Sequence, residues 1–173
     1  ALLGLLLGDP LVKGEATFEG RKLLSSAAAA RVRGRKIGFV TQAAKNALNP
    51  AYTIYFQVAE AAALTMPLDD AANRPDLLIA DEPTTGLDLV TQASILHLLG
   101  DLKNRLGLTG LLITHDVQVM CVADELVILQ DGCVVEQGAV DKVAADPHQE
   151  YTRRLLNTRL SPLAVKVAAL LEV

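Results

Sequence analysis

The sequence predicts an α/β fold in which a mainly parallel sheet is flanked by helices and carries an antiparallel edge. Three short apolar runs, each bounded by turn residues, predict buried strands over residues 36–42, 77–82 and 110–116. A long segment between the last two carries apolar residues at helical spacing, which predicts a helix packed on the sheet. The pair Asp131-Gly132 separates two further strand-like runs and predicts a tight hairpin.

Local patterns assign the other segments. Alternating polarity that ends in a glycine predicts an edge strand near the start, and Gly107 is expected to end the long helix. The expected elements are an edge strand (15–20), a helix (88–106), the two hairpin strands (125–130 and 133–137), and helices over 139–145, 148–158 and, by composition alone, 163–173.

Composition indicates one domain with an aliphatic core. The 173 residues are 51% apolar and only 3% aromatic, and no run approaches the length of a membrane span. The formal charge of −4, with acids and bases interspersed, argues against sequence-independent nucleic-acid binding. Cys121 and Cys133 lack the spacing of a zinc site, so both are expected to be buried free thiols.

The candidate site lies where the strands end. Asp81 and Glu82 follow the apolar residues 77–80, and Pro-Thr-Thr-Gly then breaks the strand. In open α/β sheets, ligands bind at the carboxyl ends of the strands. One carboxylate can hold Mg²⁺, usually through water, and the next can orient an attacking water on a phosphate. The alternative is a buried strand that simply ends in two solvated acids.

Polar residues also end the two neighbouring strands. Gln42 ends the first, and His115 ends the third, so the chain order is Gln, Asp-Glu, His. With Thr85-Gly86-Leu87-Asp88 after the carboxylates, this combination resembles the nucleotide-binding subunit of ATP-binding-cassette (ABC) transporters, a P-loop NTPase fold of the RecA-like type.

The resemblance implies a role for each of these residues. Gln42 is then the Q-loop glutamine and Asp81 the Walker B aspartate, both directed at Mg²⁺ and ATP. Glu82 and His115 are the catalytic glutamate and the switch histidine, and Asp88 lies in the D-loop at a dimer interface. From the residues alone, Gln42 can equally cap the next turn, and Asp88 can be a helix N-cap.

Other segments resemble the oligopeptide, dipeptide and nickel importer branch of the family. They are Ala47–Pro50, Thr53-Ile54, Arg74–Asp76, Gln92-Ala93, Val135–Gly138 and Pro147–Arg153. This resemblance extends from Ala1 to about Pro162. It implies an ATPase subunit that energises import of peptides, nickel or similar small solutes. The implied partners are two membrane permeases, a second ATPase subunit and an external solute-binding protein, and the implied location is peripheral, on the cytoplasmic face of the inner membrane.

The chain departs from the family in two places. No Gly-Lys pair exists, so the phosphate-binding loop G-x-x-x-x-G-K-[ST] (Walker A) is absent, and so is the L-S-G-G-Q signature. We expect a single ABC ATPase domain over 1–173, with the phosphate loop missing before residue 1, the helical subdomain missing near 64–72, and a helical C-terminal extension over 146–173. A longer complete protein is therefore expected, and a natural or engineered fragment is the alternative.

Two other functions stay open. One is a non-transport ABC ATPase, although no tandem cassette, coiled-coil insert or basic arm is visible in the sequence. The other is a truncated, non-hydrolysing cassette that acts as a binding or structural subunit. The missing Walker A favours it, whereas the intact Asp81, Glu82 and His115 argue against it.

Overall fold

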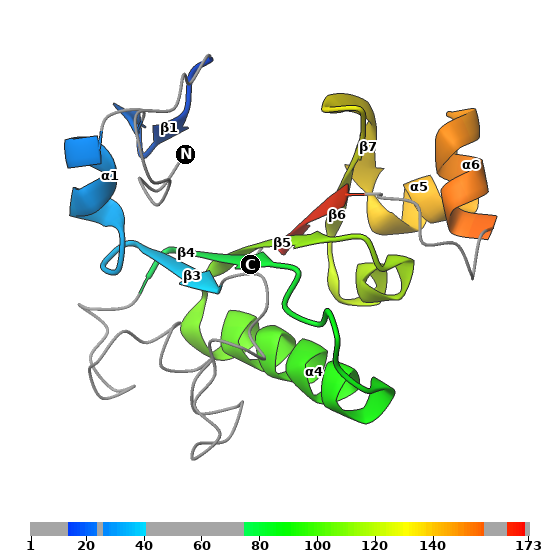
Figure 1. The fold of residues 1–173 in the computed structure, drawn as a ribbon, viewed down its shortest axis with the longest axis horizontal. Helices are drawn as coiled ribbons and strands as arrows, with labels where there is room; N and C mark the ends of the chain where they lie inside the picture. Colours follow the sequence, from blue (N-terminus) through cyan, green and yellow to red (C-terminus); the bar gives the residue numbers. More distant parts are fainter. Residues whose placement is uncertain (1–13, 24–25, 41–74, 158–165, 172–173) are drawn as a thin grey trace.

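A six-stranded sheet forms the centre of the molecule. The computed structural model describes residues 14–23, 26–40, 75–157 and 166–171 (Figure 1). The strand order is β3-β4-β5-β8-β6-β7. The strands are β3 (Ile37–Val40), β4 (Leu77–Asp81), β5 (Thr109–Thr114), β6 (Glu125–Gln130), β7 (Cys133–Ala139) and β8 (Lys166–Leu171).

The first three strands are parallel, and their register brings their carboxyl ends to one edge. Val40 pairs with Ala80, and Asp81 pairs with Ile113. The middle residues of β4 are buried, as expected for a strand covered on both faces. The α/β class with parallel strands is confirmed. Antiparallel pairing covers β8, β6 and β7, and so extends beyond the edge hairpin that the sequence predicts.

One long helix, α4 (Leu89–Leu106), packs along one face of the sheet (Figure 1). Asp88 caps its start, and Gly107, in the left-handed conformation at φ 62°, ends it. Its buried side chains are Ile95, Leu96, Leu98, Leu99 and Leu102. These join strand residues such as Leu78 and Leu112 in the main core, so the amphipathic helix predicted for this segment is confirmed.

Shorter elements complete the described structure. They are β1 (Thr17–Phe18), β2 (Arg21–Lys22), α1 (Ser26–Val32), a 3₁₀ segment (Val117–Val122), α5 (Val140–Ala145) and α6 (Glu150–Asn157). The predicted hairpin and the helices α5 and α6 are confirmed, and both helices lie beside β7 (Figure 1). The strand expected over 15–20 is shorter and forms a separate two-stranded sheet with β2, not an edge of the main sheet.

Two expectations are wrong. The C-terminal segment expected to be helical over 163–173 forms β8 at Lys166–Leu171, between β5 and β6. A short, uninterrupted apolar run does not distinguish a strand from a helix, and here pairing on both sides satisfies the backbone groups of β8. Cys133, expected to be buried, is an exposed free thiol because it follows the turn at Gly132 on the edge strand β7.

None of the helices in the described part of the chain has the length and apolar character needed to cross a membrane.

Candidate functional site

The chain turns sharply after β4, and this turn places Glu82. Asp81 is the last residue of the strand, and Glu82 follows with φ 49°, a left-handed conformation that is uncommon for residues other than glycine. The Glu82 N–H donates to the carbonyl of Ile113 on β5 at 2.7 Å. The turn continues with a hydrogen bond from the Thr85 N–H to the Glu82 carbonyl at 3.2 Å. A strained residue held by both neighbouring segments is a feature of functional sites.

Both carboxylate oxygens of Glu82 have a neighbour. Oε1 lies 3.3 Å from Nδ1 of His115, and Oε2 accepts a hydrogen bond from the Thr85 hydroxyl at 2.9 Å. The Glu82 side chain is 11% exposed, whereas that of His115 is 48% exposed. A carboxylate has about four lone-pair positions and can accept several hydrogen bonds at once.

His115 follows the end of β5 in a short loop. The next residue, Asp116, donates its N–H to the hydroxyl of buried Thr114 at 3.0 Å. The Asp116 carboxylate accepts a hydrogen bond from the side-chain amide of Gln92 on α4. In the sequence, Gln92 is only part of the resemblance to the importer branch, and Asp116 has no predicted role. No local pattern signals this pair, because its partners come from different elements.

Asp88 binds its own helix. Its carboxylate accepts hydrogen bonds from the backbone N–H groups of Val90 and Thr91, at 3.1 and 2.9 Å, and from the Thr91 hydroxyl at 2.7 Å. The Thr91 hydroxyl first, and then the Thr91 backbone N–H, hold the pKa of Asp88 below its ordinary value. The predicted role of Asp88 as a helix N-cap is confirmed. Its place at a dimer interface stays a prediction.

The structure therefore brings Glu82 and His115 into contact, and it leaves Asp81 adjacent at the strand end. Asp88 follows the turn after Glu82 and is the N-cap of α4. Gln42 lies outside the described residues. The catalytic, cofactor and metal roles of these residues stay predictions.

The carboxylates fit part of a magnesium site. Within the described residues, no group of three or more His, Cys, Asp or Glu side chains could hold a metal ion on its own. Asp81 and Glu82 nevertheless supply hard oxygen ligands at a strand end. Mg²⁺ commonly keeps several waters and takes only one or two carboxylates together with substrate phosphates. The donor set thus suits Mg²⁺ that arrives with a nucleotide.

Comparison with known proteins gives a consistent set of relatives. No family model matches the chain. It is 34% identical over 189 residues to the peptidoglycan transport ATP-binding protein YejF of Agrobacterium fabrum, covering 83% of this chain and 35% of that protein. It is 33% identical over 191 residues to the oligopeptide transport ATP-binding protein OppD of Bacillus subtilis, covering 83% of this chain and 53% of that protein.

A solved structure shares the fold. The dimeric post-hydrolysis state of the ATP-binding cassette MJ0796, bound to ADP and Pi, aligns with a TM-score of 0.56 and 24% identity, covering 76% of this chain and 75% of that one. The present chain spans roughly a third to a half of the length of the two curated relatives named above.

Proposed function

We propose that this chain is an ATP-binding-cassette subunit that carries the hydrolytic half of an ATPase site and energises uptake of peptides, nickel or similar small solutes. The observation that carries this proposal is the contact between Glu82 and His115 at the ends of neighbouring parallel strands. The names of the relatives, which are ATP-binding proteins of peptidoglycan and oligopeptide transport, support the choice of substrate class.

The proposed reaction is hydrolysis of ATP to ADP and phosphate. Glu82 orients a water molecule and accepts a proton from it as the water oxygen bonds to the γ-phosphorus and the bond to the leaving ADP oxygen breaks. His115 holds Glu82 on one side and is directed at the γ-phosphate on the other. Catalysis of this kind depends mainly on positioning, and the two contacts on the Glu82 carboxylate provide it.

Asp81 and Gln42 are the proposed contacts of Mg²⁺, partly through water. When bound, Mg²⁺ neutralises phosphate charge. Asp88 caps α4 and is proposed in addition to face a second ATPase subunit, identical or not. The further proposed partners are transmembrane permeases and, indirectly, an external solute-binding protein, with the protein peripheral at the cytoplasmic face of the inner membrane.

We also propose that the complete protein contains a phosphate loop and a helical subdomain beyond this sequence. The alignment with YejF supports an internal gap, since it spans 189 residues while covering 83% of the 173-residue chain. The intact mass of the purified protein tests this proposal. A mass well above 18.4 kDa is expected, and a mass equal to that value would contradict it.

Steady-state ATP hydrolysis by the complete protein tests the function. We expect Mg²⁺-dependent phosphate release, and we expect His115→Ala to lower kcat by about 100-fold or more. His97→Ala is the matched control, because His97 lies on α4 with its side chain 80% exposed and should leave kcat unchanged. A wild-type protein that binds ATP without releasing phosphate would instead support the non-hydrolysing cassette.

A further inference from the structure

A hydrogen bond joins the start of α4 to the loop that carries His115. The side-chain amide of Gln92 donates to Oδ2 of Asp116, and both side chains are half-buried. Gln92 lies one helical turn after the N-cap, and its backbone N–H donates to the Asp88 carbonyl at 2.9 Å. A bond from an amide to a carboxylate is among the stronger hydrogen bonds, so it ties the two segments together.

A second hydrogen bond, to buried Thr114, also anchors the loop that carries His115. The Asp116 N–H donates to Thr114 Oγ1 at 3.0 Å, and Thr114 is only 2% exposed. His115 lies between these two anchored residues. Its own side chain is half exposed, so the position of its ring against Glu82 depends on how firmly the loop backbone is held.

The contacts close a ring around the site. Glu82 binds Thr85 through its Oε2, and the chain runs on from Thr85 to Asp88, which caps α4. The hydrogen bond between Gln92 and Asp116 connects α4 to the loop that carries His115. His115 in turn contacts Oε1 of Glu82. These contacts connect the turn 85–88 to both oxygens of the Glu82 carboxylate.

We propose that Gln92 and Asp116 are positioning residues that hold His115 against Glu82 and couple it to the turn 85–88. The proposal rests on the proposed ATPase function. Both residues act through His115, so their loss should slow the chemical step and leave nucleotide affinity largely unchanged. A bond that merely fastens α4 to the sheet would instead affect stability without a selective effect on kcat.

The test uses three replacements of Gln92 in the complete protein. Gln92→Leu removes the donor at similar size, Gln92→Glu places a like charge beside Asp116, and Gln92→Arg restores a donor. We expect the first two to lower kcat by about 10- to 100-fold with the KM for ATP within about twofold of wild type. Gln92→Arg should recover most of the lost kcat.

Ser94→Ala is the matched control. It removes another side-chain hydrogen bond of α4, from the Ser94 hydroxyl to the Val90 carbonyl at 2.9 Å, without touching the loop after β5. It should leave kcat unchanged. If Gln92→Leu keeps wild-type kcat while Glu82→Gln abolishes turnover, the positioning role is overturned and the ATPase function stands.

If the wild-type protein shows no hydrolysis, the proposed function is overturned. A second measurement then tests the positioning role of Gln92 and Asp116. The imidazole signals of His115, recorded by NMR at one fixed pH without nucleotide, should differ between Gln92→Leu and wild type and agree between Ser94→Ala and wild type. Unchanged His115 signals in Gln92→Leu would overturn the positioning role independently of any turnover.

Discussion

Nδ1 of His115 lies 3.3 Å from Oε1 of Glu82, and the register of two parallel strands produces this contact. Asp81 pairs with Ile113, so the residues that follow β4 and β5 leave the sheet side by side. The turn at Glu82, with φ 49° and a hydrogen bond to the Ile113 carbonyl, fixes the carboxylate next to the β5 loop. The geometry of the site is therefore a property of the sheet and of one unusual backbone conformation.

Replacement of Thr85 tests the second contact of the Glu82 carboxylate. Thr85→Val removes the hydroxyl that donates to Oε2 at 2.9 Å and keeps the side-chain shape. We expect kcat for ATP hydrolysis by the complete protein to fall by about tenfold, because the carboxylate loses a hydrogen bond that orients it. Thr85→Ser keeps the donor and should retain most of the activity. Equal kcat values for the valine and serine variants would contradict this role.

Asp88 is expected to make stability pH-dependent at acidic pH. Hydrogen bonds, first from the Thr91 hydroxyl and then from its N–H, lower the pKa of Asp88 from 3.8. A carboxyl whose pKa is lower in the folded state adds stability above its unfolded pKa, and this stability is lost as the pH falls through the folded pKa.

The matched variant is Asp88→Asn, which keeps the capping geometry without a titrating group. Urea unfolding at several pH values should give a stability difference between wild type and variant that is constant above about pH 5 and shrinks at lower pH. The same difference at every pH would contradict the ionised cap.

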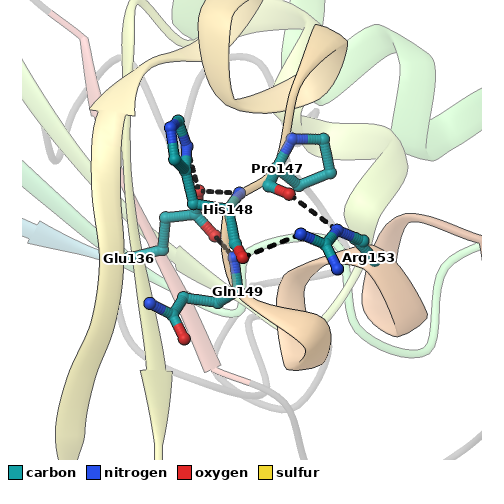
Figure 2. Close-up of polar contacts among 5 residues, drawn as sticks. All are labelled: Glu136, Pro147, His148, Gln149 and Arg153. Atoms are coloured by element: carbon teal, nitrogen blue, oxygen red, sulfur yellow. Dashed lines mark hydrogen bonds and ion pairs between the residues drawn. The ribbon is translucent and has the colours of Figure 1, made fainter.

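Glu136 anchors the start of α6 to β7 (Figure 2). Its carboxylate accepts hydrogen bonds from the backbone N–H groups of His148 and Gln149, at 2.8 and 3.1 Å. Arg153 adds bonds from Nε to the Pro147 carbonyl at 2.8 Å and from Nη2 to the His148 carbonyl at 2.9 Å. Burial raises the pKa of Glu136, but the nearby Thr152 hydroxyl and the two N–H groups outweigh burial and lower it.

We expect Glu136→Ala to lower the free energy of unfolding by about 1–3 kcal/mol, because two N–H groups lose a charged acceptor. The stabilisation is present above the unfolded pKa of about 4.5 and should fade as the pH drops through the lower folded value. Hydrogen exchange should show the loss first in α6. Unchanged protection of α6 in the variant would count against the anchor.

The core beneath the hairpin is expected to be sensitive to truncation. Leu126 on β6 is 0% exposed, and Leu126→Ala should cost about 2–5 kcal/mol by denaturant unfolding. Val134 on the neighbouring strand is 54% exposed, so Val134→Ala should change stability by no more than about 0.5 kcal/mol. Similar costs at the two positions would contradict the described burial.

Local sequence patterns predicted much of the fold. The strands expected over 77–82 and 110–116 form as β4 and β5, which end one and two residues earlier than predicted. The helix between Asp88 and Gly107 and the turn at Asp131 also follow from apolar periodicity and turn chemistry. The strand β8 was missed because its apolar run fits either a helix or a strand. Only its pairing with distant neighbours decides between them.

The candidate site was predictable in part. The positions of Glu82 and His115 at strand ends predict that they lie close together, and the two side chains are in contact. The bond between Gln92 and Asp116 has no such signal, because neither residue type implies a partner on another element. The left-handed backbone at Glu82 was also hidden, since such a conformation normally signals glycine.

The most direct test of the central claim is a comparison of wild type with Glu82→Gln in the complete protein, measuring ATP affinity and turnover on the same samples. The amide keeps the size of the side chain and can still contact His115 and Thr85, but it cannot accept a proton from water. We predict ATP affinity within about threefold of wild type and kcat lowered by about 100- to 10,000-fold. Turnover near the wild-type rate would contradict the assignment of Glu82 as the general base.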